Sequence, residues 1–531
     1  MIIHPLLVAV YPLVALLAEN IHAMQVSDAF RAILLSLLMS GLLLGAFRLL
    51  LRDWHRAAIL ASISLLLFFS YGHIYNLIRS QEIWGVNFGR HRYLIAAWIA
   101  IFGLSIYFFG YKLKQAYRIT PILNFTALIL LILPVFTIAS VQFQPRSGQQ
   151  ISTQQEAESQ APEKEFEGDL PDVYYIILDG YARADVLQER YGYDNSEFIE
   201  FLESHGFYVA DKSHSNYLYT ALSIGSTLNM QYIQDLNVDF DRVTYPKFMF
   251  EPIRHSPVRQ EFESIGYKTV AMPTGYDATE IEDVDYFLSP DMDTMEVLLE
   301  GEILNRFEEL ALTTSALRTV IDLQASQDAN WFAKQLEYPH HVHRLNVLAA
   351  FENAQTVPRL PGSKFVFVHI ISPHRPYLFG PDGEEIDPQG VFTFKEVSGP
   401  PEKQGVNYYL AQLTYITTRI EETIEIILAR SDKQPIIVLQ SDHGPGYGID
   451  WEDPDRIHLD DRSAILNAYF LPDECKQELY PTITPVNSFR LVLNCAFGES
   501  YEMLPDISYF NNIRYSSLSE PWEFTPIDEF E

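Results

Sequence analysis

The chain has 531 residues, more than one ordinary domain contains. Its 37 Lys and Arg residues are outnumbered by 69 Asp and Glu residues, which gives a formal net charge of −32. Ten of the basic and four of the acidic residues precede residue 142, so the remainder holds 27 basic against 65 acidic residues. This acidic remainder argues against nucleic acid as a partner, because nucleic-acid binding depends on Lys and Arg side chains that neutralise phosphates.

Five apolar segments precede residue 145. A helix needs about 20 mostly apolar residues to cross a bilayer, and the second to fifth segments meet that requirement. The first is weaker, because Pro12 lies inside it and Glu19 lies near its end. We therefore expect a transmembrane domain of about five helices over residues 1–143, with apolar segments at 5–22, 31–51, 57–78, 93–111 and 120–142.

Basic residues in the short loops predict the orientation of these helices. Lys and Arg concentrate in cytoplasmic loops, and here three follow the second segment and three follow the fourth. Three arginines after the third segment oppose this assignment. The balance favours a cytoplasmic N-terminus and an extracytoplasmic C-terminal part. The loop residues are Arg48, Arg52 and Arg56; Lys112, Lys114 and Arg118; and the opposing Arg79, Arg90 and Arg92.

Residues 144–170 are rich in Gln, Glu and Ser and poor in large apolar side chains, so we expect a flexible linker. The residue composition changes at residue 171. Short runs of β-branched and aromatic residues alternate with helix-like stretches, a pattern typical of an α/β domain with a buried, mostly parallel central sheet. We expect this soluble domain over residues 171–531, with strands in "DVYYIILD", "KFVFVHIISPH" and "PIIVLQSDH".

Each of these three runs ends on a side chain that can bind a metal: Asp179, His374, and the pair Asp442 and His443. A lone Asp after a strand is usually a turn residue or a helix cap. In open α/β sheets, however, ligands bind beyond the carboxyl ends of the strands. Three such ends together favour a functional site.

A fourth stretch, "SHSNYLYTALSIGSTLNMQYI", places Thr220 where small polar residues lead into an apolar helix pattern. One interpretation is an ordinary capped helix. The alternative is a hydroxyl nucleophile at a helix N-terminus, where free N–H groups and the helix dipole stabilise phosphate or sulfate oxygens. Metal coordination is one way to activate such a hydroxyl.

Taken in order, "LDGYARAD", "YTALSIGSTLN", "HIISPHRPY" and "SDHGPG" resemble the alkaline phosphatase/sulfatase superfamily. "NAYFLP" and "TPVNSFRLVLN" look like two further segments of the sulfatase-like fold, so the resemblance spans about residues 171–500. It implies that Asp179, Asp442 and His443 bind a divalent metal and that Thr220 is the nucleophile and a further ligand. Hard carboxylates with an imidazole suit one or two ions of Mn²⁺, Zn²⁺ or Mg²⁺.

The remaining histidines divide into two groups. By the resemblance, His374 contacts substrate or a second metal and takes part in proton transfer, and His458 is a more loosely spaced candidate for the same region. We interpret His369 as a structural histidine of an apolar strand face. The cluster His340, His341 and His343 is interpreted as a surface loop. Cys475 and Cys495 form either a disulfide or two buried thiols.

Two departures from the sulfatases refine the function. No cysteine occupies a Cys-x-Pro-Ser-Arg context, and Ile224 stands where those enzymes have an arginine. A Thr nucleophile behind five membrane helices and a linker is instead similar to lipoteichoic acid synthases and lipid A phosphoethanolamine transferases. The resemblance implies a membrane-anchored transferase that moves a phosphoglycerol or phosphoethanolamine head group from a membrane lipid, through a phospho-threonine, to a cell-envelope acceptor.

Two alternatives stay open. The first is a sulfatase-like hydrolase with water as the acceptor, acting as a phosphodiesterase, phosphatase or sulfuric ester hydrolase. The second is a non-catalytic membrane protein built on the same fold.

Overall fold

The computed structural model describes residues 2–19, 21, 26–78, 82–83, 86–87, 91–142, 170–236, 238, 246–290, 305–320, 331–386, 403–447, 449, 451, 455–511 and 522–529. The chain divides into two compact units, residues 1–149 with 294–338 and residues 150–293 with 339–531. The predicted linker at 144–170 lies outside the described residues except for Leu170.

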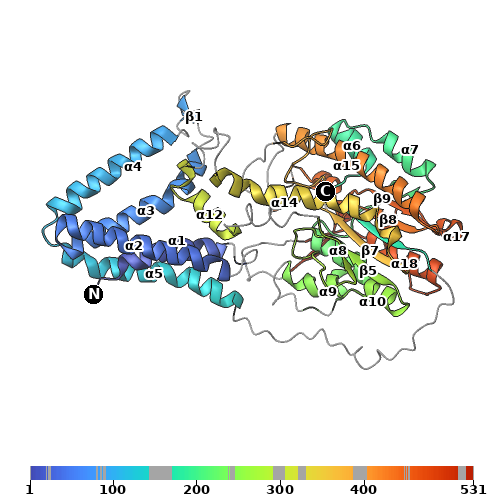
Figure 1. The fold of residues 1–531 in the computed structure, drawn as a ribbon, viewed down its shortest axis with the longest axis horizontal. Helices are drawn as coiled ribbons and strands as arrows, with labels where there is room; N and C mark the ends of the chain where they lie inside the picture. Colours follow the sequence, from blue (N-terminus) through green and yellow to red (C-terminus); the bar gives the residue numbers. More distant parts are fainter. Residues whose placement is uncertain are drawn as a thin grey trace. The chain divides into compact units, whose positions relative to one another are not determined.

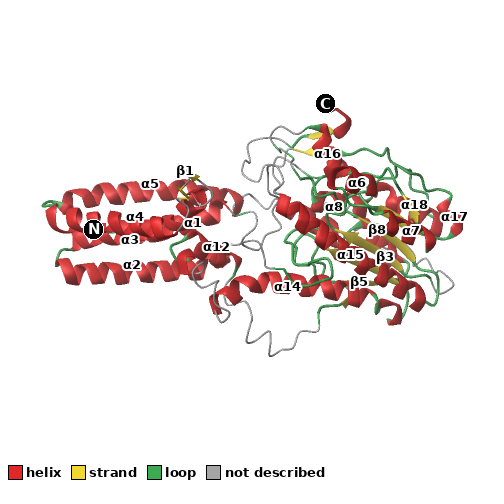
Figure 2. Ribbon diagram, turned by 90° about the horizontal axis from the view of Figure 1, so that it is seen from above, coloured by secondary structure: helices red, strands yellow, loops and turns green. Residues whose placement is uncertain are grey.

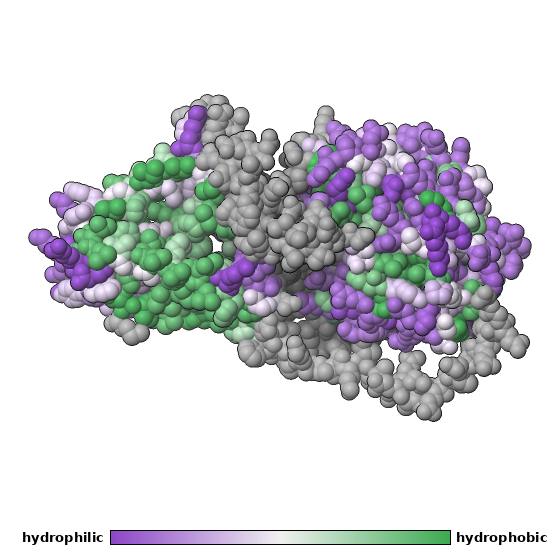
Figure 3. Space-filling view, in the orientation of Figure 1, coloured by the Kyte–Doolittle hydropathy of each residue, from purple (hydrophilic) through white to green (hydrophobic). Residues whose placement is uncertain are grey.

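The first unit contains all five predicted apolar helices. Four stretches are long and apolar enough to cross a membrane, and α1, with 16 residues, is shorter. Leucine and phenylalanine side chains cover the outside of these helices, as the hydrophobic surface in Figure 3 shows. A helix that is apolar on all sides belongs in a membrane, so the chain is a multi-pass membrane protein. The helices are α1 (His4–Glu19), α2 (Phe30–Leu51), α3 (Trp54–Ile78), α4 (His91–Ser105) with a π-helical extension (Ile106–Lys112), and α5 (Ala116–Gln142).

A segment from much later in the chain also belongs to this unit. Helix α12 (Arg306–Thr314) begins at Asn305, whose side chain accepts a hydrogen bond from the Glu308 amide in a capping box. The Glu308 carboxylate pairs with Arg31, and the Ala316 amide donates to the Phe68 carbonyl at 2.8 Å. These contacts join residues 305–320 to the apolar helices.

Helix α14 (Trp331–Ala354) corrects one expectation. His340, His341 and His343, interpreted as a surface loop, are helical, and His340 and His343 are buried. The His343 ring lies against the Ile371 carbonyl, with Nε2 3.1 Å from that oxygen. The apolar residues that follow in the helix, such as Val347 and Phe351, pack into the core and bury this face.

A seven-stranded sheet forms the centre of the second unit (Figure 2). Its order is β4-β9-β8-β3-β7-β5-β6; strands β8, β3, β7, β5 and β6 run parallel, and β9 is antiparallel to both β8 and β4. The predicted, mostly parallel sheet is therefore confirmed. The strands are β3 (Val173–Leu178), β4 (Tyr208–Val209), β5 (Lys268–Ala271), β6 (Tyr286–Phe287), β7 (Lys364–Ile370), β8 (Ile436–Gln440) and β9 (Asn467–Phe470).

Helices cover both faces of this sheet, because its central strands are apolar on both sides. Along β3, Val173, Tyr175 and Ile177 enter one core cluster, while Tyr174, Ile176 and Leu178 enter the other. Figure 1 shows α8 (Thr220–Asn229), α9 (Phe250–Arg254) and α10 (Pro257–Ser264) on one face, and α6 (Ala184–Tyr191), α7 (Ser196–Ser204) and α15 (Lys403–Arg430) on the other. Helix α18 (Pro485–Phe497) packs beside α8.

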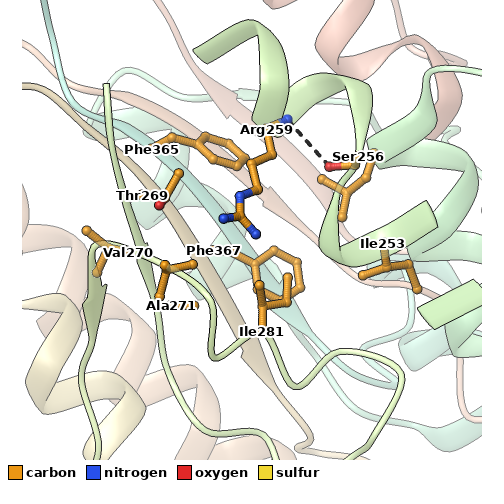
Figure 4. Close-up of a pocket in the computed structure, with 11 residues that line it drawn as sticks. Ile253, Ser256, Arg259, Thr269, Val270, Ala271, Ile281, Phe365 and Phe367 are labelled. Carbon is orange, nitrogen blue, oxygen red and sulfur yellow. Dashed lines mark hydrogen bonds between the residues drawn. The ribbon is translucent and has the colours of Figure 1, made fainter. Parts of the chain in front are cut away.

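Two smaller features complete this unit. Cys475 and Cys495 form a disulfide that joins α17 (Asp473–Lys476) to α18, which decides between the two alternatives left by the sequence. A small, mainly apolar cavity lies beside β5 and β7, with Arg259 among the residues that line it (Figure 4). None of the predicted site residues lines that cavity.

Candidate metal centre

The ends of β3, β7 and β8 are hydrogen-bonded together. The Asp179 amide extends the ladder of β3 to the Ile370 carbonyl at 3.0 Å, and the Asp179 carbonyl accepts from the His374 amide at 2.9 Å. From the other side, the Gly180 amide donates to the Asp442 carboxylate at 3.2 Å. Asp179, His374, Asp442 and His443 are all buried, so the three strand ends bring four of the predicted residues to one place.

Thr220 reaches the same place from a helix. It is the first residue of α8, after Tyr219 in an extended conformation, and its Oγ1 lies 3.1 Å from His443 Nε2. Thr220 is partly exposed, whereas Ala221 to Leu228 are all buried. A threonine at this position presents its hydroxyl beside the free N–H groups of the helix start.

Among the described residues, two overlapping groups of side chains could hold a metal ion. One is Asp179, His374 and His443, and the other is Asp179, His369 and Asp442. In each group the ligand atoms lie within 4.8 Å of one another, and every member is buried. Asp179 belongs to both groups, so it is the residue around which the centre is organised.

The hydrogen bonds around His443 fit a cation. His443 Nδ1 lies 3.0 Å from the Gly444 carbonyl, which can only accept, so Nδ1 carries the proton and Nε2 presents a lone pair. That Nε2 lies 3.2 Å from Asp442 Oδ2 and 3.6 Å from Asp179 Oδ1. Both oxygens are buried and accept no hydrogen bond from the described residues. Two buried carboxylate oxygens without a donor, beside an imidazole lone pair, are an arrangement that a metal ion satisfies.

The electrostatics agree with this geometry. Burial, and then the charge of Asp179, raise the pKa of Asp442 to about 8. Burial also opposes ionisation of Asp179, but the nearby His374, His369 and His443 outweigh it and hold the pKa of Asp179 below its usual range. Two buried carboxylates this close repel each other, and a divalent cation between them would remove that repulsion.

Sequence reasoning missed His369. We interpreted it as structural, yet its Nε2 lies 3.4 Å from Asp179 Oδ2 and its Nδ1 lies 2.8 Å from Thr279 Oγ1. A second partner of this kind fixes the ring orientation of a metal-binding histidine. The available signal was a histidine within the apolar strand β7, five residues before His374.

Sequence reasoning also missed Arg462, on α16 (Arg456–Ser463). Arg462 is only 2% exposed, and its Nη2 lies 2.8 Å from His443 Nε2. Its Nε donates to the Leu218 carbonyl at 3.0 Å and its Nη1 to the Gly444 carbonyl at 2.9 Å. No local pattern marked this residue, because it reaches the site from a helix that lies outside the motifs.

The glycines of "SDHGPG" make room for this helix. A Cβ on Gly444 would lie 2.2 Å from the Asp461 carbonyl oxygen, and a Cβ on Gly446 would lie 2.6 Å from Arg462 Cδ. Gly446 also has a positive φ of 61°. The motif is therefore glycine-rich because α16 approaches it closely, as well as because the chain turns.

The other predicted histidines lie as follows. His374 is buried, with Nδ1 2.7 Å from the Arg375 carbonyl, and its ring centre is 5.8 Å from that of His443. His458 is partly exposed at the start of α16, where its Nδ1 lies 2.7 Å from Asp455 Oδ2. Within the described part of the chain, His458 belongs to neither metal-capable group.

No family model and no curated protein matches this sequence. Among solved structures, the chain is similar to the periplasmic domain of EptC from Escherichia coli in complex with Zn, with 13% identity and a TM-score of 0.43 over 69% of this chain and 95% of that one. It is also similar to the integral membrane protein lipooligosaccharide phosphoethanolamine transferase A from Neisseria meningitidis, with 13% identity and a TM-score of 0.37 over 92% and 95% of the two chains. A putative sulfatase from Bacteroides thetaiotaomicron has 12% identity and a TM-score of 0.36 over 62% and 72%.

Proposed function

We propose that this protein is a membrane-anchored, metal-dependent phosphoryl-group transferase with Thr220 as its nucleophile. The observation that carries the proposal is the position of the Thr220 hydroxyl, 3.1 Å from His443 Nε2 at the start of α8 and beside two buried carboxylates. A hydroxyl at an ion site and at a helix N-terminus suits attack on a phosphoryl group.

Asp179, Asp442 and His443 would hold the divalent cation, Mn²⁺, Zn²⁺ or Mg²⁺, together with Thr220. His369 would serve the same ion, because it shares a metal-capable group with Asp179. His374 shares the other such group, but in the transfer described next it is the residue that carries a proton. When bound, the cation supplies Lewis acidity, which polarises a phosphoryl oxygen and lowers the pKa of a ligated hydroxyl.

The residues of the chain would then perform a two-step transfer. Thr220 Oγ1 gives its proton to solvent water and attacks the head-group phosphorus of a phospholipid; the bond from phosphorus to the diacylglycerol oxygen breaks, and phospho-Thr220 forms. His374 gives a proton to the departing diacylglycerol oxygen. In the second step an acceptor hydroxyl attacks phospho-Thr220 and gives its proton to His374, the bond from phosphorus to Thr220 Oγ1 breaks, and Oγ1 takes a proton back from solvent water.

The architecture supports a lipid as the proposed substrate. The same chain carries four helices that are long and apolar enough to cross a membrane, so its catalytic unit stays with membrane lipids. The Cys475–Cys495 disulfide favours an oxidising, extracytoplasmic compartment, in agreement with the basic loops. A phosphoethanolamine or phosphoglycerol lipid is therefore the proposed donor, and a cell-envelope molecule is the proposed acceptor.

The test uses the full-length protein in detergent with head-group-labelled phosphatidylethanolamine or phosphatidylglycerol. We expect diacylglycerol release and a labelled phospho-Thr220 that mass spectrometry detects. Thr220→Ala should abolish both. Thr227→Ala is the matched control, because Thr227 lies on the same helix and is fully buried, with its hydroxyl donating to the Ser223 carbonyl. Unchanged diacylglycerol release in Thr220→Ala would refute the proposal.

The products separate the alternatives. Label on an added glycolipid acceptor supports a transferase, whereas free ethanolamine phosphate or glycerol phosphate with an unlabelled acceptor indicates a hydrolase. A protein that binds no divalent ion and releases no diacylglycerol would be a non-catalytic member of this fold.

A further inference from the structure

Arg462 places a permanent positive charge inside the metal centre, and the transfer described above does not use it. An arginine side chain stays charged at any ordinary pH, and burying a charge is costly unless it has partners. This side chain is 2% exposed. Its presence beside metal ligands therefore needs a reason.

The partners of Arg462 fall into two kinds. Nε and Nη1 donate to the backbone carbonyls of Leu218 and Gly444, which anchors the plane of the guanidinium group. Nη2 is different, because it donates to His443 Nε2 at 2.8 Å. That lone pair is the one that a metal ion bound by His443 would occupy. Arg462 and the metal therefore compete for the same electrons.

Nη2 also lies beside the nucleophile. Thr220 Oγ1 is 3.1 Å and Arg462 Nη2 is 2.8 Å from the same nitrogen of His443. A phosphoryl group on Thr220 extends its oxygens about 2.5 Å beyond Oγ1, within hydrogen-bond reach of a donor in this position. Charge-assisted bonds from arginine to phosphate are among the strongest that proteins make.

We propose that Arg462 is the anion-binding residue of this centre. When a divalent cation takes the lone pair of His443, the Nη2–H group turns from His443 to a phosphoryl oxygen on or beside Thr220. The inference rests on the proposed function and adds an order to it, because the metal must bind before the anion is held tightly.

The two glycines of "SDHGPG", Gly444 and Gly446, fix the position of the Arg462 side chain through close packing. A Cβ on Gly446 would approach the Arg462 Cδ methylene to 2.6 Å, and a Cβ on Gly444 would meet the carbonyl oxygen of Asp461 at 2.2 Å. Gly444 and Gly446 of the metal-binding motif therefore leave the space into which α16 and the Arg462 side chain pack.

Arg462 should consequently have opposite effects on the two ligands. It repels a cation and competes for His443, so it weakens metal binding. It attracts an anion, so it strengthens phosphate binding. A residue with a purely structural role would affect both ligands in the same direction when it is replaced.

The test measures both affinities on the full-length protein in detergent by calorimetry, first with Zn²⁺ or Mn²⁺ alone and then with inorganic phosphate added to the metal-loaded protein. For Arg462→Gln we expect metal affinity that is unchanged or higher, and phosphate affinity that falls about 10- to 100-fold, the range for losing a hydrogen bond to a charged group. Arg462→Lys keeps the positive charge but lacks the planar guanidinium, so its phosphate affinity should lie between those of wild type and Arg462→Gln.

Arg456→Gln is the matched control, because Arg456 lies on the same helix and pairs with Asp460 and Asp528 at the surface. It should leave both affinities unchanged. A parallel loss of metal and phosphate binding in Arg462→Gln, or an unchanged phosphate affinity, would overturn the proposal. Either result would leave the labelling of Thr220 intact, so it is distinguishable from failure of the proposed function.

If both Arg462 variants fail to fold, the wild-type protein decides the question. A crystal structure with Zn²⁺ and phosphate should place an Arg462 nitrogen within hydrogen-bond distance of a phosphate oxygen. An Arg462 still directed at His443 in that structure would overturn the proposal.

Discussion

The sharpest structural prediction concerns Gly446→Ala, which adds one methyl group between the metal motif and Arg462. Two costs follow from the geometry. Gly446 has φ 61°, and a residue with a side chain pays about 1–2 kcal/mol in this left-handed region. The new Cβ would also lie 2.6 Å from Arg462 Cδ and 3.1 Å from Ile449 Cδ1, whereas ordinary contacts begin near 3.4 Å.

The second cost comes from overpacking, which typically destabilises a protein by about 1–3 kcal/mol. A matched substitution isolates it. Gly192 has nearly the same backbone conformation, with φ 67°, but nothing lies within 4 Å of an added Cβ. Gly192→Ala should therefore show the backbone cost alone, and the difference between the two variants measures the displacement of Arg462.

The assay is thermal unfolding of the detergent-solubilised, metal-free protein. About 1 kcal/mol corresponds to about 2–4 °C in domains of roughly 150–250 residues and to less in a larger unit such as this one, so Gly446→Ala should unfold roughly 1–5 °C below Gly192→Ala. Its metal-loaded form should also bind phosphate more weakly, because Arg462 is displaced. Equal unfolding temperatures for the two variants, with equal phosphate affinities, would refute the packing that we describe around Arg462.

Three further predictions address other parts of the molecule. The pKa of Asp442 is raised to about 8 in the folded, metal-free protein, so the folded state favours the protonated carboxyl. The free energy of unfolding should therefore fall as pH rises from the pKa of an ordinary carboxyl group towards 8. The unfolding temperature of the metal-free protein should therefore rise as pH is lowered from about 9 to about 6. The Asp442→Asn variant should unfold at a higher temperature than wild type, show no such rise, and bind Zn²⁺ more weakly. If its unfolding temperature depends on pH as that of wild type does, the raised pKa of Asp442 is contradicted. Cys475→Ser removes the disulfide to Cys495, 20 residues away, and should lower the free energy of unfolding by about 3 kcal/mol. Denaturant titration of the oxidised wild type and the variant measures this difference. An unchanged unfolding midpoint would count against a structural disulfide. Gly72→Val should release residues 305–320 from the apolar helices, because a Cβ on Gly72 would lie 2.4 Å from the Thr314 backbone. Gly103→Val is the control, because nothing lies within 4 Å of a Cβ added there. Amide hydrogen exchange of residues 305–320 should be faster in Gly72→Val only, and equal exchange in both variants would show that this contact does not hold the segment.

Local sequence determined much of this molecule. The apolar helices could be predicted because a membrane span requires a long run of apolar residues and nothing else. The strands β3, β7 and β8 could be predicted because a doubly covered parallel sheet needs continuous apolar runs. Asp179 and the pair Asp442 and His443 could then be placed together, since the carboxyl ends of parallel strands meet at one edge.

Tertiary structure decided what came from outside these motifs. Arg462 enters the centre from α16, and His369 turns from an apolar strand towards Asp179; neither has a neighbour in sequence that reveals its partner. The pairing of Arg31 with Glu308 likewise joins residues that are 277 positions apart.

The physical reason is the range of the interactions. Hydrophobic period, turn chemistry and strand ends are properties of a few consecutive residues, so the sequence alone specifies the elements and the edge where the ligands gather. Which buried charge balances which carboxylate depends on long-range packing, because a partner 20 or 280 residues away is equally near once the chain has folded. The meeting of Asp179, Asp442 and His443 at one edge of the sheet could therefore be predicted from sequence, whereas the cation that faces them, Arg462, could only be found in the folded structure.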